Sequence, residues 1–234
     1  MNEVLLIGAG GLGCGAALAL AAGGATRLVV IDDDVVDETN LHRQILHGAS
    51  AVGQPKAESL ARSLRERFPA VEVTPVLGRF DATSALRLLS ECAVAIDGSD
   101  NLATKFLAND AAVLARKPLV HGAAVETWGQ LLTVPAGGHP CYRCLFEELP
   151  PPDADAPSCA EAGVLGPVPG VIGALQAAEA LRILRGESPT LTGRLIRYDS
   201  RLMTMRAIRF KRNRACAVCG DRPSITTLDP DRTR

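Results

Sequence analysis

The residues best suited to chemistry begin with a glycine-rich turn near the start of the chain. The turn Gly8-Ala9-Gly10-Gly11-Leu12-Gly13 follows the apolar run 4–7 and precedes an Ala/Leu-rich stretch. Glycine lets the backbone approach an oxygen-rich anion, and a helix N-terminus favours negative charge. The turn therefore predicts a nucleotide phosphate site, whereas its alternative role is tight packing alone. The candidate phosphate-binding residues are Gly8, Gly10, Gly11 and Gly13.

An acidic residue and two cations follow the turn at positions that suit a nucleotide. Asp32 lies 19 residues beyond Gly13, at the end of a second apolar run, where a carboxylate can bind a ribose hydroxyl. A nicotinamide or flavin dehydrogenase fits this much equally well. Arg43 and Lys56 follow within one segment, and two cations suit a triphosphate better than a pyrophosphate. Each cation alone is compatible with a solvated surface, but together they favour ATP.

A second acidic group, Asp97-Gly98-Ser99-Asp100, ends a later apolar run. Magnesium that bridges phosphates takes only one or two protein carboxylates, so a carboxylate here is a candidate ligand. The alternative is that Asp100 caps the helix expected from Asn101. Position in the sequence leaves both roles open.

The seven cysteines fall into three groups. Cys141-Tyr142-Arg143-Cys144 and Cys216-Ala217-Val218-Cys219 are two Cys-x-x-Cys pairs with 71 residues between them. Four thiolates suit a closed, structural zinc site that would tie a mid-chain loop to the C-terminal region, and redox pairs are the alternative. Cys14 and Cys92 lie among apolar residues and are expected to be buried. Cys159 lies outside both pairs and is either an exposed nucleophile or an incidental thiol.

The elements that must position these residues alternate between strand and helix. Expected strands cover residues 4–7, 28–31, 71–76, 93–96 and 119–120, and expected helices cover 12–22, 56–67, 82–89 and 101–115. This alternation predicts an α/β, Rossmann-like doubly wound fold, with a mostly parallel sheet and helices on both faces. Ligands bind such sheets at the carboxyl ends of the strands, where Asp32 and residues 97–100 fall.

The second part of the chain has a different character. Residues 135–169 are rich in Pro, Gly and Cys and are expected to form a long loop. A helix over 171–184 and a hairpin of antiparallel strands at 195–198 and 203–210 are expected to follow. Residues 1–225 would then form one nucleotide-binding domain, with a polar tail over 226–234.

Composition restricts the class of protein. Of the 234 residues, 47% are hydrophobic and 22% are charged, which suits a soluble globular domain. The net charge of -1 gives no electrostatic footprint for nucleic acid or an anionic membrane. Because no apolar run is long enough to span a membrane and no signal peptide is evident, we expect a cytoplasmic protein without disulfides.

These motifs together resemble those of the ThiF/MoeB/HesA family of adenylyltransferases, relatives of the ubiquitin-activating enzymes. The matching stretches run in family order between residues 4 and 220. They are GAGGLGCG, IDDDVVDETNLHRQ, GQPKAES, DGSDN, GAAVETWGQ, CYRCLF, SCAEAG, GVIGALQAAEALRIL and CAVCG. The most specific part is NLHRQ with GQPK and the four-cysteine frame.

The resemblance implies adenylation, by ATP, of the C-terminal glycine of a small ubiquitin-like sulfur carrier of ThiS or MoaD type. It also implies a homodimer. The implied nucleotide-binding residues are the four glycines with Asp32, Asp34, Asn40, Arg43, Gln44, Lys56, Asp100 and Asn101, and Asp100 would hold Mg²⁺. The implied catalytic residues are Arg43, Lys56, Asp100 and Cys159, the last matching a cysteine that in some members bonds covalently to the carrier. Zinc would be bound by Cys141, Cys144, Cys216 and Cys219.

Two features depart from the family pattern. Members usually carry a segment before the first strand, with an arginine that reaches the partner subunit's ATP site, whereas this sequence starts three residues before the expected strand. We therefore expect another residue to serve that role, or an incomplete phosphate clamp. No rhodanese-like domain follows, so we expect a separate sulfur donor. The alternative functions are a non-catalytic carrier-binding or heterodimer partner, which would not need all of Arg43, Lys56 and Asp100, and a dinucleotide-dependent oxidoreductase.

Overall fold

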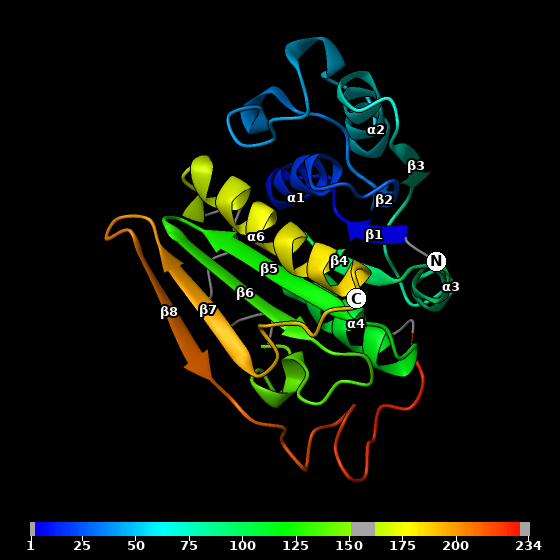
Figure 1. Ribbon diagram of the computed structural model, residues 1–234, viewed down its shortest axis with the longest axis vertical. Coiled ribbons are helices and arrows are strands. Elements are labelled where there is room, and N and C mark those ends of the chain that lie inside the picture. The colour runs from blue at the N-terminus through cyan, green and yellow to red at the C-terminus, as the bar shows by residue number, and fades with distance from the viewer. Residues whose placement is uncertain (1–2, 151–161, 230–234) are drawn as a thin grey trace.

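The computed structural model describes residues 3–150 and 162–229, which are built around one eight-stranded sheet (Figure 1). The strands lie in the order β3-β2-β1-β4-β5-β6-β7-β8. The first five of these run parallel, and β6, β7 and β8 continue the sheet in antiparallel pairs. Their bounds are β1 Glu3–Ile7, β2 Arg27–Asp32, β3 Glu72–Leu77, β4 Val94–Asp97, β5 Leu119–Val125, β6 Trp128–Val134, β7 Arg194–Asp199 and β8 Thr204–Arg209.

Helices cover both faces of the sheet. They are α1 Gly11–Ala22, α2 Lys56–Arg67, α3 Ala85–Glu91, α4 Leu102–Leu114 and α6 Pro167–Leu184. Buried side chains of α1, α2 and α6 form one apolar cluster, and those of α3 and α4 form a second cluster on the opposite face. These two layers confirm the expected doubly wound α/β fold. Within the described ranges, none of the helices has the length and apolarity to cross a membrane.

The position of β1 in the sheet explains why residues 4–7 form a continuous apolar run. β1 lies between β2 and β4 at the middle of the parallel part of the sheet. Val4 and Leu6 belong to the cluster beneath α1 and α6, whereas Leu5 and Ile7 belong to the cluster beneath α3 and α4. Because a central parallel strand is covered on both faces, none of its apolar side chains alternates outward to solvent.

From residue 119 onward, the structure differs from the elements that the sequence predicts. β5 extends to Val125, and a two-residue turn leads directly into β6, which the sequence prediction missed. The turn residue Glu126 has a φ of 49° without being glycine, so the usual hairpin signal is lacking. Helix α6 begins at Pro167 rather than at residue 171, because proline is well tolerated in the first turn of a helix. Leu228, in the expected polar tail, packs against the α4-side cluster.

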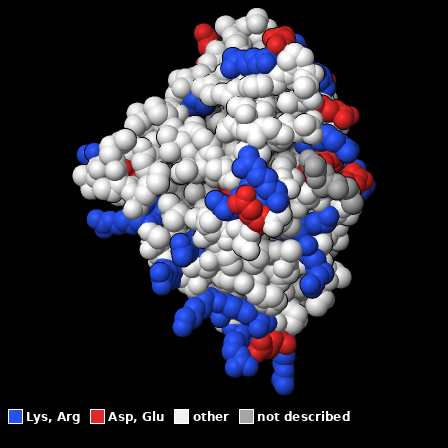
Figure 2. All heavy atoms as spheres, in the orientation of Figure 1, with Lys and Arg blue, Asp and Glu red and all other residues white. Residues whose placement is uncertain are grey.

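The edge strand β8 carries a basic surface. Figure 2 shows Lys and Arg side chains gathered along the lower left edge of the molecule, where β8 and the segment after it lie in Figure 1. In the register of β7 with β8, Arg194 lies opposite Arg209 and Arg197 opposite Arg206. Like charges directly opposite one another destabilise a strand pair, so these arginines do not account for the hairpin's stability.

Candidate functional site

A cavity of about 320 Å³ opens at the carboxyl ends of β1, β2 and β4. This is the edge of the sheet at which ligands of doubly wound folds bind. Ten of the expected nucleotide-binding residues line it, namely Gly8, Gly10, Gly11, Asp32, Asp34, Arg43, Gln44, Lys56, Asp100 and Asn101. Gly13 and Asn40 are not among its lining residues. The structure therefore brings together most of the residues that the sequence singled out.

The glycine turn joins β1 to α1 and forms the floor of the cavity. Gly8 has a φ of 95° and donates its N–H to the Ile31 carbonyl at 2.9 Å, which fixes the turn against β2. Gly10 is the N-cap residue of α1, and the nearest atom to a Cβ added there would be Nε2 of Gln44, at 3.7 Å. Gly10 thus leaves open space above the start of the helix, where an anion can meet backbone N–H groups.

Gly13 packs closely against the backbone of the turn. A Cβ added to Gly13 would lie 2.0 Å from the Gly8 carbonyl oxygen, so the turn would have to move. We expect Gly13→Ala to lower the free energy of unfolding by about 1–3 kcal/mol, the usual range for an overpacked site. Gly10→Ala is the matched control in the same turn, and we expect it to weaken nucleotide binding while leaving stability near that of the parent. Urea unfolding of both variants measures the difference, and equal stability of the two would contradict it.

Asp32 ties the end of β2 to the glycine turn. Its Oδ2 accepts the Ala9 N–H at 2.7 Å and its Oδ1 accepts the Asp34 N–H at 2.8 Å. Burial raises the pKa of Asp32, and these two backbone hydrogen bonds oppose that rise. Since a carboxylate oxygen has two acceptor positions, each oxygen can still accept a ribose hydroxyl.

The two expected cations lie in the cavity wall in different environments. Lys56, the first residue of α2, is 6% exposed, and its Nζ lies 2.7 Å from Oδ2 of Asp34. Arg43 contacts Nε2 of His42 through its Nη1 at 3.4 Å. Gln44 is buried, and its Oε1 has no hydrogen-bond partner within the described part of the chain. Both cations thus line the same cavity as the glycine turn, where their N–H groups can meet an anion.

The two aspartates at the end of β4 have different roles. Helix α4 is capped by Asn101, whose Oδ1 accepts the Thr104 N–H at 2.8 Å, so the interpretation of Asp100 as the cap is wrong. Asp100 is exposed and lines the cavity, which suits a ligand of a hydrated Mg²⁺. Asp97 is fully buried and accepts hydrogen bonds from Ser99, Lys105 and His121. Its oxygens are therefore already used within the protein.

Two basic residues of the cavity wall were missed in the sequence. Arg79 follows Gly78 just after β3, and Lys105 lies on the first turn of α4. Arg79 could have been found by considering every strand end rather than the ends of β1, β2 and β4. Lys105 lies four residues after the N-cap Asn101, and no local signal in the sequence marks it as a residue of the cavity.

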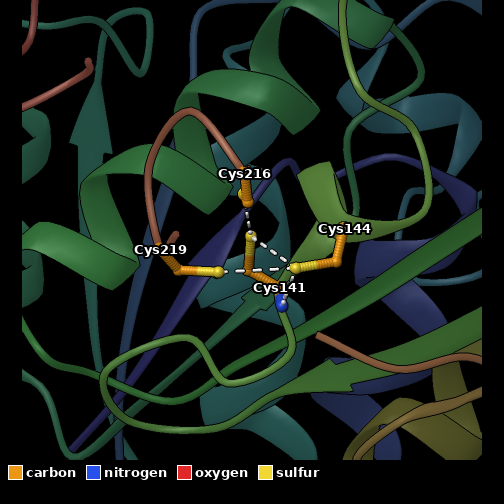
Figure 3. Close-up of side chains that lie close together, drawn as sticks. All are labelled: Cys141, Cys144, Cys216 and Cys219. Carbon is orange, nitrogen blue, oxygen red and sulfur yellow. Dashed lines mark hydrogen bonds between the residues drawn. The ribbon is translucent and has the colours of Figure 1, made fainter. Parts of the chain in front are cut away.

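The four cysteines of the two Cys-x-x-Cys pairs meet on the α4 side of the sheet (Figure 3). Their sulfur atoms all lie within 4.8 Å of one another. The Cys141–Cys144, Cys141–Cys216 and Cys144–Cys219 Sγ separations are 3.9, 3.6 and 3.4 Å. Zinc–sulfur bonds of about 2.3 Å place tetrahedral sulfurs about 3.8 Å apart, whereas a disulfide requires about 2.05 Å. The donor set and its spacing fit a tetrahedral zinc ion.

The remaining cysteines do not join this cluster. Cys14 and Cys92 are buried, as expected, and burial raises their pKa values to about 12 and about 11. Thiols with such pKa values are unreactive at neutral pH. Cys159 lies outside the described residues.

Comparison with known proteins finds relatives that match nearly the whole chain. The chain is 45% identical to "Adenylyltransferase and sulfurtransferase MOCS3" of Aedes aegypti over 228 residues, which are 97% of this chain and 52% of that protein. It is 45% identical to the "SAMP-activating enzyme E1" of Haloferax volcanii over 220 residues, 94% of this chain and 81% of that protein. The chain thus spans about half the length of the MOCS3 relatives.

Solved structures agree on the fold. E. coli MccB superposes with a TM-score of 0.81 at 23% identity, over 94% of this chain and 66% of MccB. A crystal structure titled as E. coli MccB with ATP gives a TM-score of 0.77 at 25% identity, over 93% of this chain and 66% of that chain. The model of the ThiF family matches residues 1–218. With a match over nearly its whole length, the chain belongs to the ThiF family.

Proposed function

We propose that this protein uses ATP to adenylate the C-terminal glycine carboxylate of a small ubiquitin-like sulfur carrier that ends in Gly-Gly, with release of pyrophosphate. The observation that carries the proposal is the cavity that joins the glycine turn to Arg43, Lys56 and Asp100. Relatives that are named as an adenylyltransferase and sulfurtransferase and as a SAMP-activating enzyme support it. The product would serve sulfur transfer in thiamin, molybdopterin or related biosynthesis.

The reaction requires charge neutralisation more than proton transfer. An oxygen of the carrier's carboxylate attacks the α-phosphorus of ATP, the bond to the β-phosphate oxygen breaks, and pyrophosphate leaves with the electron pair. No general base is needed because a C-terminal carboxylate is ionised at neutral pH. Arg43 and Lys56 stabilise the charge that grows on the phosphate oxygens. Asp100 would hold Mg²⁺, which would offset charge on the same oxygens.

The pairing of Lys56 with Asp34 does not prevent this role. An ammonium group has three N–H donors, and the contact with Asp34 Oδ2 uses one of them. Asp34 is two-thirds exposed at its side chain, so its charge is strongly solvated and competes weakly for the buried Lys56. Asp32 would bind the ribose, which places the nucleotide across the ends of β2 and β1.

The proposal extends to cofactors and partners. Zinc bound by the four clustered cysteines is structural, because all four positions of a tetrahedral ion would be filled by protein ligands. Cys159 is proposed as the cysteine that can bond to the carrier, and a sulfur donor would displace AMP from the acyl-adenylate. A homodimer is proposed from the family resemblance, and a cytoplasmic location is proposed as the default for this sequence.

Carrier-dependent exchange of labelled pyrophosphate into ATP tests the proposal. We expect exchange with a Gly-Gly-ended carrier from the same genome, and none with that carrier after removal of its last glycine. The competing function, a non-catalytic partner, predicts ATP binding without exchange. Preference for NAD over ATP would instead support the oxidoreductase.

A further inference from the structure

A buried network of polar side chains lies between the nucleotide cavity and the zinc cluster. Its centre is Asp97, at the end of β4, which is fully buried. Its Oδ2 accepts hydrogen bonds from Nζ of Lys105 on α4, at 3.0 Å, and from Nδ1 of His121 on β5, at 2.8 Å. Its Oδ1 accepts from the backbone N–H and the hydroxyl of Ser99. Side chains of three different elements therefore converge on one carboxylate.

Stability alone does not account for this network. Full burial opposes ionisation of Asp97, but Lys105, His121 and Ser99 outweigh burial and hold its pKa below the usual range. Replacing a buried ion pair by apolar residues of similar volume is often neutral or stabilising. A role in the nucleotide cavity, which Lys105 also lines, accounts better for the buried charges of Asp97 and Lys105.

Lys105 has one donor left for a ligand. Its side chain is 6% exposed, and its Nζ donates to Oδ2 of Asp97 and to the Gly122 carbonyl at 2.5 Å. An ammonium group has three N–H donors, so two are satisfied within the described protein contacts. The residue forms part of the cavity wall together with Ala123 of β5. The remaining N–H is the one that a bound anion can use.

The order of the strands separates Lys105 from the end of the cavity that carries Asp32. In the sheet, β2 carries Asp32 for the ribose, β1 leads into the phosphate turn, and β4 and β5 follow in that order. Neighbouring strands lie about 4.8 Å apart, so the end of β4 is roughly 10 Å from the ribose position. Beyond the ribose and the α-phosphate, the next group in the reaction is the carboxylate that attacks.

His121 holds this arrangement from the side of the zinc cluster. Burial lowers the pKa of its imidazole, so the ring is neutral at pH 7, donates through Nδ1 to Asp97 and leaves Nε2 as an acceptor. Nε2 is buried without a hydrogen-bond partner among the described residues and borders a pocket of about 20 Å³, room for one water. The ring of Tyr142 packs on the imidazole with centroids 4.6 Å apart, and Tyr142 lies between the zinc-site residues Cys141 and Cys144.

We propose that Lys105 binds the carboxylate of the acyl substrate, and that Asp97 and His121 are positioning residues that hold its ammonium in the cavity wall. The inference rests on the proposed adenylation. Lys105 would attract the substrate carboxylate to a site that already holds the negative phosphates, leaving the other carboxylate oxygen to attack phosphorus. Asp97 compensates the lysine's charge while the site is empty, so the ammonium needs no counter-ion from solution.

Binding of a carrier-tail peptide tests the inference independently of turnover. The probes are a short Gly-Gly-ended peptide with a free carboxylate and the same peptide as a C-terminal amide, each titrated into protein saturated with a non-hydrolysable ATP analogue. We expect the parent protein to prefer the free acid by about 10- to 100-fold, as for one charge-assisted hydrogen bond. Lys105→Met should remove this preference, Lys105→Arg should restore most of it, and affinity for the ATP analogue should change less than about twofold in both.

Control variants separate binding from folding. Lys105→Met leaves the Asp97 carboxylate without its cation. The double variant Lys105→Met/Asp97→Asn therefore keeps the network neutral, and it should also lose the preference for the free acid. His121→Asn can still donate to Asp97 and should resemble the parent, whereas His121→Phe should weaken the preference. Lys211→Met, on the exposed surface, should change nothing. An acid preference that survives in the double variant, or is absent from the parent, overturns the inference, whereas failure of pyrophosphate exchange alone bears on the proposed function.

Discussion

Asp100→Ala is expected to lower carrier-dependent pyrophosphate exchange by about 100- to 1,000-fold while leaving the fold intact, a loss typical of removing one electrostatic contact in an active site. The reason is geometric. Asp100 is exposed in the cavity wall, and the helix that follows is capped by Asn101 instead. The carboxylate is therefore placed to act on a ligand, without a structural task in α4.

The control for this prediction is the neighbouring residue. Asn101→Ala removes the hydrogen bond to the Thr104 N–H and should lower the free energy of unfolding by about 1 kcal/mol. Asp100→Ala should leave that quantity unchanged, as measured by urea unfolding.

We expect Arg43→Ala to abolish exchange as well, because Arg43 also lines the cavity, with Arg43→Lys retaining part of it. Near-normal exchange in either alanine variant would remove that residue from the mechanism.

The second large effect concerns the zinc cluster. Replacing Cys144 and Cys219 by serine should abolish zinc binding and lower the free energy of unfolding by more than about 3 kcal/mol, because structural zinc contributes roughly 10–16 kcal/mol to the folding of small zinc-finger peptides. The ion would join the segment at residues 141–144 to the segment at 216–219, which are otherwise distant in the chain. Elemental analysis and thermal unfolding of the parent and the double variant measure both effects.

A cysteine outside the cluster provides the matched control. Cys92 is buried in the same apolar cluster but is not among the four clustered residues. Cys92→Ala should keep one zinc per chain and lose only the stability expected of a small cavity. Parent protein purified without chelator that contains almost no zinc would contradict the assignment.

Elements of the fold whose boundaries depend on local interactions could be predicted from the sequence, and elements that depend on distant contacts were harder to predict. Helix α2 was expected over 56–67 and observed there, because its boundaries depend on local signals such as Pro55 before it. The parallel strands were identifiable because burial on both faces makes them continuous apolar runs. β6 was missed because its hairpin turn places Glu126 at a positive φ, which a glutamate in the sequence does not predict. The terminal hairpin was recognised, since β7 and β8 were both expected close to their observed positions.

The site was predictable to the extent that its residues are tied to the ends of single strands. Asp32, Asp100 and the glycine turn could be assigned to the edge of a parallel sheet before the order of the strands was known. Lys105 and His121 could not, because their contacts with Asp97, and the role proposed for them, depend on β4 and β5 being neighbours and on α4 packing beside them. The choice between a cap and a metal ligand at Asp100 likewise required the geometry of Asn101.

The chemical form of the carrier after incubation with the enzyme and ATP tests the central claim most directly. Intact-mass spectrometry, followed by fragmentation, would show where any adenylyl group resides. We predict that the parent protein produces a carrier with one adenylyl group on its C-terminal glycine, together with an equal amount of pyrophosphate, and that the Asp100→Ala variant does not. An unmodified carrier with the parent enzyme, under conditions in which ATP is bound, would contradict the account.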